Sequence, residues 1–406
     1  MVFIQFDEVL KLSSTTNAPL LMIPGPTPVP QSVLEALARP TEGHSSATTA
    51  AALHRLQEGV ADAVGAVPLA GADRAMVVVM AGSGTLALEA GIVNLVPPGE
   101  KLLVVSHGLF GDRYAAVGRA IGAEVELLSA PWGEQVAPDK VEAALRASGA
   151  RFMTATHVDT ANGVMAPFRE YAALARRLGV TMVLDAVASA GGMPIDMAES
   201  GIDVVVTASQ KALGMPPGLG IVIVSSKALA IRRELPSCRS YFLDWLNWEG
   251  PMEDPTAKYF ATIPTNMVVA GGVAMEIAGA EGWERRFRRH RRMARATRRG
   301  LRALGLSVLA ADEVLGATVT ATGLPVGIGS ADLRAEVARE GVTIAGGIGE
   351  WAQTAVRFGH MGALGLPELL QAISAMESAM LRLGAPVERG AGVAELVCGW
   401  GHDLND

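Results

Sequence analysis

The stretch TMVLDAVASAGGMPIDMAESGIDVVVTASQK, residues 181–211, decides the fold of this chain. It contains two short apolar runs, at Met182–Asp185 and Val204–Val206. These runs are continuous rather than alternating, which is typical of parallel strands that helices cover on both faces of a sheet. Asp185 closes the first run and Lys211 follows the second, so each strand leads into a chemically active side chain.

The same alternation of strands and helices continues on both sides of this stretch. The strand-like runs begin about 25 to 30 residues apart, as in β-α-β units. We expect further strands at Met76–Met80, Leu102–Ser106, Val125–Leu128, Phe152–Thr156 and Gly220–Val224, and helices at Leu86–Leu95, Arg113–Ile121, Asp139–Ala147 and Arg169–Leu178. Right-handed crossovers between such strands predict an α/β fold with a mainly parallel sheet covered by helices.

The pattern changes after residue 266, where a long helix is expected at Gly282–Gly300. This helix holds nine arginines: Arg285, Arg286, Arg288, Arg289, Arg291, Arg292, Arg295, Arg298 and Arg299. Less polar side chains recur along it at helical spacing, at Trp283, Phe287, His290 and Ala294. We therefore interpret it as an amphipathic helix with a solvated basic face, and not as a helix that binds nucleic acid or a membrane surface.

A second, smaller sheet is expected beyond this helix. Its strands are predicted at Val308–Leu309, Ala317–Ala321, Val342–Ile344 and Ala355–Arg357, and a closing helix at Pro367–Leu383. We predict four parts: an N-terminal segment (1–22), a large domain (23–265), a smaller α+β domain (266–384) and a tail without clear periodicity (385–406).

Length and composition narrow the class of protein. A chain of 406 residues is long enough for two domains that share a site. Its 34 Lys and Arg against 41 Asp and Glu give a net charge of −7, which disfavours nucleic-acid binding because that affinity comes largely from phosphate neutralisation. Mean hydropathy is high at +0.31, yet no run reaches the roughly 18 apolar residues of a membrane span.

The N-terminus and the cysteines point to a cytoplasmic protein. Asp7 and Glu8 interrupt the apolar N-terminal stretch, so no secretory signal is expected. The two cysteines, Cys238 and Cys398, make neither a disulfide framework nor a metal cluster. We expect a cytoplasmic oligomer that binds neither nucleic acid nor membranes and holds no metal.

A glycine-rich turn follows the first expected strand. Gly82 and Gly84 let the backbone approach an anion closely, and Ser83 and Thr85 add hydroxyl groups at the start of a helix. The turn has neither the lysine of a P-loop nor the third glycine of a dinucleotide-binding turn. It is typical of a cup for one phosphate, although an ordinary strand-to-helix turn has the same composition.

Asp185 and Lys211 extend this pattern. A carboxylate at the end of a parallel strand points toward the edge where such sheets hold ligands, although a helix-capping acid is the alternative. Lys211 is one of six lysines and lies between an apolar strand and a loop rich in Gly and Pro, where desolvation favours a neutral amine; a surface lysine is the alternative. A phosphate cup, an acid and an amine in this order match the needs of pyridoxal 5′-phosphate.

The chain resembles the class V aminotransferases, and within them the alanine–glyoxylate and serine–glyoxylate aminotransferase group, over residues 22–384. The resemblance rests on Pro24–Thr27, Gly82–Thr85, His107–Arg113, Thr156–Gly163, Asp185–Ser189, Ser209–Lys211 and Arg357–Gly362. It implies the fold of the aspartate-aminotransferase-like enzymes, a homodimer, and pyridoxal 5′-phosphate as cofactor.

The resemblance also implies a role for each matching position. Lys211 matches the lysine that forms a Schiff base with the cofactor, and Asp185 matches the partner of the pyridine nitrogen. Further cofactor-binding positions are Ser83, Gly84, Thr85 and Gln210 near the phosphate, Phe110 stacked on the ring, Thr160 near the ring oxygen, and Tyr259 and Thr262 toward the phosphate of the neighbouring subunit. Arg357 matches the arginine that binds the substrate carboxylate, a task suited to a planar guanidinium.

Two positions depart from the family pattern. Ser45 stands where members often have arginine, and Val158 stands where glycine is common. Because the sequence shows one carboxylate-binding arginine and no obvious second one, we expect alanine or serine as amino donor and glyoxylate or pyruvate as acceptor. Ser45 and the long tail leave a specialised amine donor open, as in pyridoxamine–pyruvate aminotransferases.

Two other classes of function share part of this pattern. Cysteine desulfurases share the acid and the lysine but need a reactive cysteine well downstream, and no cysteine lies between Cys238 and Cys398. The second class is a binding protein that has kept the fold without the activity. The presence of an imine-forming lysine together with Asp185 and Arg357 argues against it, because a binding protein has no need for this set.

Overall fold

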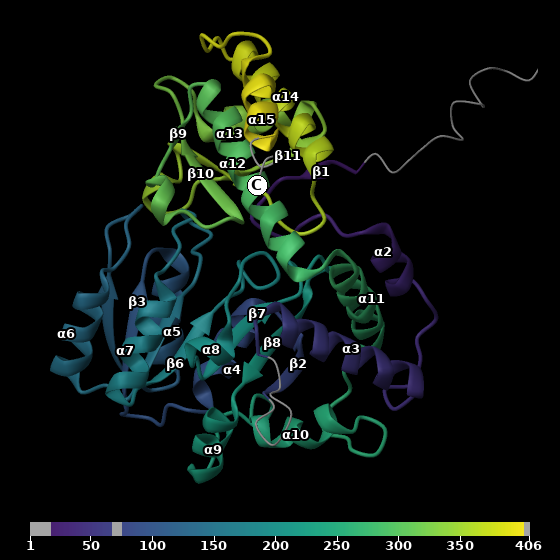
Figure 1. The fold of residues 1–406 in the computed structure, drawn as a ribbon, viewed down its shortest axis with the longest axis vertical. Coiled ribbons are helices and arrows are strands. Elements are labelled where there is room, and N and C mark those ends of the chain that lie inside the picture. Colours follow the sequence, from purple (N-terminus) through teal and green to yellow (C-terminus); the bar gives the residue numbers. More distant parts are fainter. Residues whose placement is uncertain (1–17, 67–74, 402–406) are drawn as a thin grey trace, which may run out of the picture.

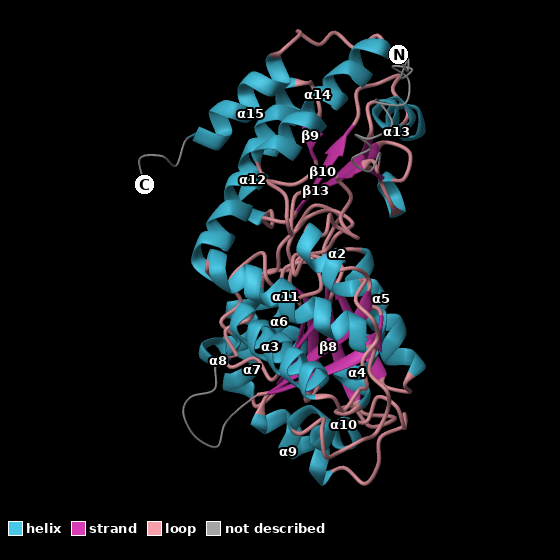
Figure 2. Cartoon of the chain, turned by 90° about the vertical axis from the view of Figure 1, so that its right-hand side faces the viewer, coloured by secondary structure: helices cyan, strands magenta, loops and turns pink. Residues whose placement is uncertain are grey.

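The computed structural model describes residues 18–66 and 75–401. The acidic N-terminal stretch around Asp7 lies outside the described residues. Figure 2 shows an elongated molecule, with a large sheet and its helices at one end and a small sheet at the other.

Seven strands form the large sheet, in the order β2-β8-β7-β6-β5-β3-β4. They are β2 (Met76–Gly82), β3 (Lys101–Ser106), β4 (Glu124–Ser129), β5 (Phe152–Thr156), β6 (Thr181–Asp185), β7 (Val204–Ala208) and β8 (Gly218–Val224). Strand β8 pairs antiparallel with both of its neighbours, β2 and β7, and the other pairs of the sheet are parallel. All residues of the central strands β5, β6 and β7 are buried, as their unbroken apolar runs predicted. The prediction of a mainly parallel α/β sheet is confirmed.

Helices cover this sheet on both faces (Figure 1). The helices in this part of the chain are α2 (Gln31–Leu37), α3 (Ala47–Ala63), α4 (Gly84–Val93), α5 (Leu109–Ala120), α6 (Pro138–Ser148), α7 (Phe168–Leu178), α8 (Met197–Ser200), α9 (Ser226–Glu234), α10 (Trp245–Glu253) and α11 (Thr265–Glu281). Local sequence fixes several of their ends; for example, Ser46 caps α3 by accepting a 3.1 Å hydrogen bond from the Thr49 amide.

The small sheet has the order β12-β13-β10-β9 and is antiparallel. Its strands are β9 (Ser307–Val308), β10 (Val319–Gly323), β12 (Ala345–Gly346) and β13 (Ala355–Gly359). The same part of the chain contains the helices α13 (Ser330–Arg339) and α14 (Leu366–Arg382) and the short 3-10 helices η2 (Asp312–Val314) and η3 (Gly349–Trp351). Residues 342–343, expected in this sheet, form β11 (Val342–Thr343), which instead pairs with β1 (Leu20–Leu21). The segment that begins with β1 therefore packs beside the small sheet, and Met22 belongs to its core.

The long basic helix is α12 (Trp283–Ala303), and the prediction of a solvated basic face is wrong for much of it. Arg286 is 4% exposed and Arg298 is 9% exposed. Arg298 donates to the Thr320 hydroxyl at 3.2 Å and to the Gly316 carbonyl. These guanidinium groups satisfy buried carbonyl and hydroxyl oxygens, which explains why they are inside the protein.

The tail also differs from its prediction, because it contains a helix, α15 (Ala391–Gly401), that packs along α12. Arg299 forms an ion pair with Glu395, and Arg292 donates to the Trp400 carbonyl at 2.8 Å. The tail shows no periodicity because only a few small or apolar residues of α15 are buried. In the described part of the chain, no helix is long and apolar enough to cross a membrane.

Candidate active site

Lys211 lies in the turn between β7 and β8, and its amine is directed at the segment around Pro24. Its Nζ donates to the Pro24 carbonyl, and the Thr27 hydroxyl donates to the Lys211 carbonyl at 3.0 Å. Gly25 has a φ of +116°, and a Cβ there would lie 2.6 Å from Nζ, so only glycine fits. Burial, reinforced by the charge of Arg357, lowers the pKa of Lys211 to about 8. A measurable share of the amine is therefore neutral near physiological pH.

Asp185 ends β6 and is almost fully buried. Its carboxylate accepts hydrogen bonds from the Val187 amide at 3.0 Å and from the Thr156 hydroxyl at 3.2 Å. Thr156 is placed for this contact because it lies opposite Asp185 in the register of β5 and β6. Burial raises the pKa of Asp185 to about 6, and the charge of Asp159 adds to the increase. A cationic partner in this position stabilises the charged carboxylate.

The glycine-rich turn lies beside Asp185. Ser83 is the N-cap residue of α4, and its side chain makes no capping bond with the helix. A Cβ on Gly84 would lie 3.2 Å from both methyl groups of Val187, so glycine allows this close approach. Ser83 and Thr85 are exposed, and the first N–H groups of a helix such as α4 are suited to bind an anion. The buried Oε1 of Gln210 has no partner among the described residues.

Asp159 fixes the start of α5, which carries Phe110. Its carboxylate accepts from the amides of Phe110 at 2.8 Å, Gly111 at 3.3 Å and Ala161 at 2.8 Å. Burial raises the pKa of Asp159. The guanidinium of Arg113 lies 4.7 Å from the centroid of the Phe110 ring. The backbone of Phe110 is thus held by an acid from the segment that follows β5.

Arg357 on β13 joins the small sheet to the same site. Its Nε donates to the Gly346 carbonyl at 2.8 Å, and its Nη1 donates to the Thr160 carbonyl at 2.7 Å. Burial lowers the pKa of Arg357, which nonetheless stays a cation at physiological pH. The two carbonyls fix the plane of the guanidinium and leave other N–H groups for a ligand.

Tyr259 and Thr262 form a separate pair. The Tyr259 hydroxyl lies 3.1 Å from the Thr262 hydroxyl, and the Tyr259 ring packs on His44 at 5.0 Å between centroids. Tyr259 is 63% exposed. Their reach toward a neighbouring subunit stays a prediction.

The two family departures have different surroundings. Ser45 is exposed and directly precedes the N-cap of α3. Val158 is buried against Gly316, where an added Cβ would lie 2.8 Å from a Val158 methyl group. Val158 therefore packs at the junction with the small sheet.

Sequence reasoning assigned no role to Pro24, Thr156 or Asp159, which contact the candidate residues directly. Thr156 ends the strand beside that of Asp185, so strand ends alone point to it. Pro24 and Asp159 contact residues that are far away in sequence. Both lie in motifs of the family resemblance, but nothing in the neighbouring sequence indicates which residues they contact.

Cys238 does not have the surroundings of a reactive thiol. Burial raises the pKa of Cys238, the opposite of what a nucleophilic thiol requires. Cys398 is exposed on α15. Within residues 18–66 and 75–401, no three His, Cys, Asp or Glu side chains are grouped to hold a metal ion.

Comparison with known proteins identifies the family. The profile of the family "Aminotransferase class-V" matches residues 20–355. A relative described as the small subunit of a soluble hydrogenase, from Synechococcus sp., is 34% identical and covers 92% of this chain and 96% of the relative. An L-aspartate–glyoxylate aminotransferase of Paracoccus denitrificans is 32% identical over 92% of this chain and 94% of the relative.

Solved structures agree in fold. The crystal structure of an alanine–glyoxylate aminotransferase from Nostoc sp. matches with a TM-score of 0.85 at 27% identity, over 93% of this chain and 100% of that one. The family match covers most of the chain, and the sequence resemblance to this group is confirmed. The chain belongs to the class-V aminotransferase family and is a transaminase.

Proposed function

We propose that this transaminase moves an amino group from a small amino acid, alanine or serine, to a small 2-oxo acid, glyoxylate or pyruvate, with pyridoxal 5′-phosphate as cofactor. One observation carries the proposal: the partly buried amine of Lys211 lies close enough to the buried Asp185 and to Arg357 for both charges to influence its pKa. An amine, an acid and a carboxylate-binding cation in one site are the groups that amino transfer needs.

The residues present fit the cofactor. The exposed hydroxyls of Ser83 and Thr85 and the start of α4 suit a phosphate, and the unpartnered Oε1 of Gln210 lies next to Lys211 in sequence. Asp185 suits a protonated ring nitrogen. The two groups that donate hydrogen bonds to its buried carboxylate are both neutral, so a cation would be its natural further partner. Phe110 and Thr160 complete the proposed set of ring contacts. When bound, the cofactor supplies an electron sink for the charge left by loss of the α-proton.

The chain's own residues then have distinct tasks. Lys211, with a pKa of about 8, takes up and returns the α-proton of the substrate as a base. Asp185, charged above pH 6, keeps the cofactor's ring nitrogen protonated. Arg357 binds the substrate carboxylate and, because two carbonyls hold its guanidinium, orients the α-carbon.

Aspartate is a second candidate donor, and Arg334 favours it. Arg334 lies on α13 close to Gly346: a Cβ added to Gly346 would lie 3.2 Å from Arg334 Nη1. The Gly346 carbonyl accepts a hydrogen bond from Arg357, so Arg334 lies near Arg357. Its charge also lowers the pKa of Arg357. A relative at 32% identity is named an L-aspartate–glyoxylate aminotransferase. Because Arg334 is exposed, we favour the smaller donors.

We also propose that the enzyme is a cytoplasmic homodimer in which Tyr259 and Thr262 complete the phosphate site of the partner. Support comes from exposed aromatic side chains: Tyr241 is 80% exposed, and its ring packs against Phe260 in the same region of chain as Tyr259. Exposed aromatic clusters of this kind are typical of interfaces. Dilution to monomer should weaken cofactor binding, and an active monomer by light scattering would contradict the dimer.

A donor screen tests the function. The loaded enzyme is mixed with alanine, serine, aspartate, glutamate or pyridoxamine, and the single-turnover change in cofactor absorbance is recorded for each. We expect alanine or serine to react fastest. Aspartate reacting fastest, with Arg334→Gln slowing only that reaction, would establish the second candidate; pyridoxamine reacting fastest would establish the specialised alternative.

A further inference from the structure

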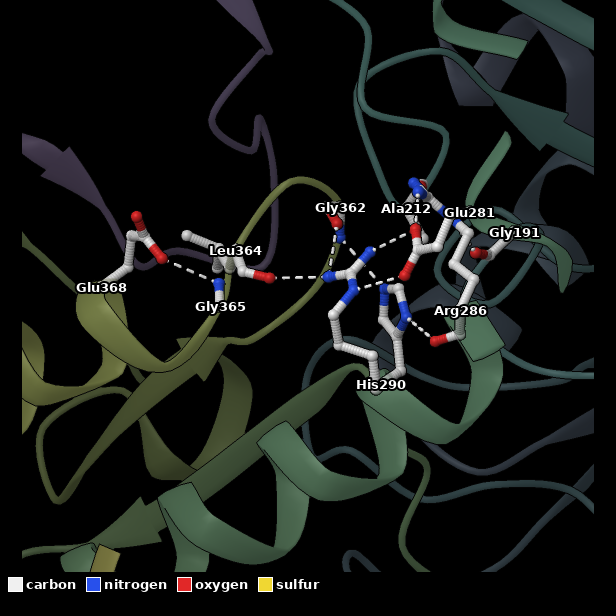
Figure 3. A network of polar contacts seen from close by, with 10 residues as sticks. Gly191, Ala212, Glu281, Arg286, His290, Gly362, Leu364, Gly365 and Glu368 are labelled. Carbon is white, nitrogen blue, oxygen red and sulfur yellow. Dashed lines mark hydrogen bonds and ion pairs between the residues drawn. The ribbon is translucent and has the colours of Figure 1, made fainter. Parts of the chain in front are cut away.

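Four polar side chains form a cluster where α11 meets α12: Glu281, Arg286, Arg289 and His290. Figure 3 labels Glu281, Arg286 and His290 among them. The Glu281 carboxylate pairs with Arg286 at 2.9 Å and with Arg289 at 2.6 Å. Burial lowers the pKa of Arg286, so the guanidinium is desolvated and depends on its acceptors. None of the four residues belongs to the proposed cofactor or substrate contacts. The cluster nevertheless contacts the two segments that follow Lys211 and Arg357.

Arg286 contacts the segment that carries Lys211. Its Nη2 donates to the Ala212 carbonyl at 2.7 Å, and its Nε donates to the Gly191 carbonyl at 2.9 Å. Ala212 directly follows Lys211, and Gly191 follows the Asp185–Ser189 segment. One guanidinium thus joins the two segments of the large sheet that hold the amine and the acid.

Arg289 and His290 contact the segment that follows Arg357. The Nη1 of Arg289 donates to the carbonyls of Gly362 at 3.0 Å and Leu364 at 2.6 Å. The Gly362 amide donates to His290 Nε2 at 3.1 Å, so the proton of His290 is on Nδ1 and is donated to the Arg286 carbonyl at 2.8 Å. Burial holds the pKa of His290 well below its usual value and keeps the ring neutral.

The two segments also meet each other. The Thr27 hydroxyl donates to the Lys211 carbonyl at 3.0 Å, and a Cβ on Gly362 would lie 3.1 Å from that hydroxyl. A Cβ on Gly362 would also lie 3.5 Å from the Lys211 carbonyl oxygen, so the cluster holds two segments that lie close together around Thr27. Arg286 donates from three separate nitrogens held in one plane, whereas a lysine would present all its donors from a single nitrogen.

We propose that Arg286 and Arg289 are positioning residues: Arg286 sets the position of Lys211, Arg289 sets that of the Arg357 segment, and Glu281 joins the two. The proposal deepens the proposed function and rests on it for the roles of Lys211 and Arg357. The proposal predicts different effects for Arg286 and Arg289, although they lie one helical turn apart. A general contribution to stability would predict the same effect for both.

Cofactor capture by the apoenzyme tests the lysine side without amino transfer. Arg286→Lys should slow the appearance of visible absorbance with pyridoxal 5′-phosphate by about 100-fold, because small displacements of a reacting group have effects of that size. Its affinity for 4-deoxypyridoxine 5′-phosphate, which keeps ring and phosphate but lacks the aldehyde, should be unchanged. Arg288→Lys, an exposed neighbour on α12, is the matched control.

Single-turnover reaction with alanine tests the separation of roles, because it resolves the maximal rate from the apparent Kd. Arg286→Lys should lower the rate by about 100-fold and leave Kd unchanged, whereas Arg289→Lys should chiefly weaken Kd. If Arg286→Lys does not fold, Glu281→Gln should show both effects together in a smaller measure. Equal behaviour of Arg286→Lys and Arg288→Lys, or loss of affinity for the analogue, would overturn the proposal.

The two proposals fail in different ways. A wild-type enzyme that captures the cofactor but transfers no amino group to it contradicts the proposed function and leaves the capture experiment on Arg286 interpretable. Amino transfer with no difference between Arg286→Lys and Arg288→Lys contradicts the positioning role alone.

Discussion

The two sheets contribute different kinds of chemistry to one site. The large parallel sheet provides Asp185 and Lys211, whose pKa values burial moves to about 6 and about 8. The small antiparallel sheet provides Arg357, which stays a cation despite partial burial. Lys211 moves a proton, which requires a pKa near the working pH, and Asp185 must be charged to hold the ring nitrogen protonated, whereas carboxylate binding requires a permanent positive charge. The division between the sheets follows this division of tasks.

The manner of support differs as well. Asp185 is positioned by its own strand, by the register with Thr156 and by the next turn of chain. Arg357 is positioned by carbonyls from two other segments, at Gly346 and Thr160. The acid is thus fixed locally, and the arginine depends on how the small sheet sits against the large one.

Removing the amine should have the largest effect. Lys211→Ala should lower the single-turnover rate by about 10⁴-fold, because the base for the α-proton is lost. Lys227→Ala is the control, since Lys227 is an exposed lysine paired with Asp203. Normal turnover of Lys211→Ala, measured by product formation, would refute the role assigned to the large sheet.

Neutralising the acid should have the next largest effect. Asp185→Asn should keep the cofactor bound but lower the rate by about 10² to 10³-fold, because an amide does not stabilise a protonated ring nitrogen. Asp203→Asn removes another buried carboxylate of the same sheet, one that accepts from the Met182 amide at 2.9 Å, and should leave the rate unchanged. Near-normal rates for Asp185→Asn would mean that another group holds the nitrogen.

Changing the small sheet's arginine should affect binding instead of rate. Charge-assisted hydrogen bonds contribute about 1.5–3 kcal/mol, so Arg357→Lys should weaken the apparent Kd for alanine by about 10- to 100-fold. Arg339→Lys on the surface of α13 serves as control. A fall in maximal rate with unchanged Kd would reverse the division of tasks between the sheets.

The stability of the apoenzyme should show the opposite trend to activity. Asp185 binds its proton more tightly when folded, so its contribution to stability falls as pH rises from about 4 to about 6. Above pH 6, apo Asp185→Asn should be more stable than wild type by on the order of 2–3 kcal/mol, from a pKa raised from 3.8 to about 6. Below pH 4 the difference should vanish. Urea unfolding at several pH values measures it, and a pH-independent difference would contradict the assigned pKa.

The sequence predicted the large sheet better than the contacts around it. Strands buried on both faces leave continuous apolar runs, so β5, β6 and β7 were found within two residues of their ends. The interior role of Arg286 was not predictable, because its acceptors at Gly191 and Ala212 are far away in sequence. Helical periodicity does not distinguish a guanidinium in water from one bonded to buried carbonyls.

The site shows the same contrast. Lys211 and Asp185 were predicted from strand ends, and family resemblance added Arg357. The Pro24 carbonyl and the Asp159 carboxylate were missed because their contacts form only when distant loops meet. α15 was missed because its stability comes from packing on α12 instead of from its own pattern.

One measurement tests the central claim most directly. The loaded enzyme is mixed with L-alanine and no acceptor, and pyruvate is quantified together with the cofactor absorbance. We predict one pyruvate per subunit and full loss of the initial absorbance. The absorbance should return when glyoxylate is added after the alanine has been removed, and neither change should occur in Lys211→Ala. Loss of absorbance without stoichiometric pyruvate, or no reaction with any amino acid or amine tested, would contradict the account.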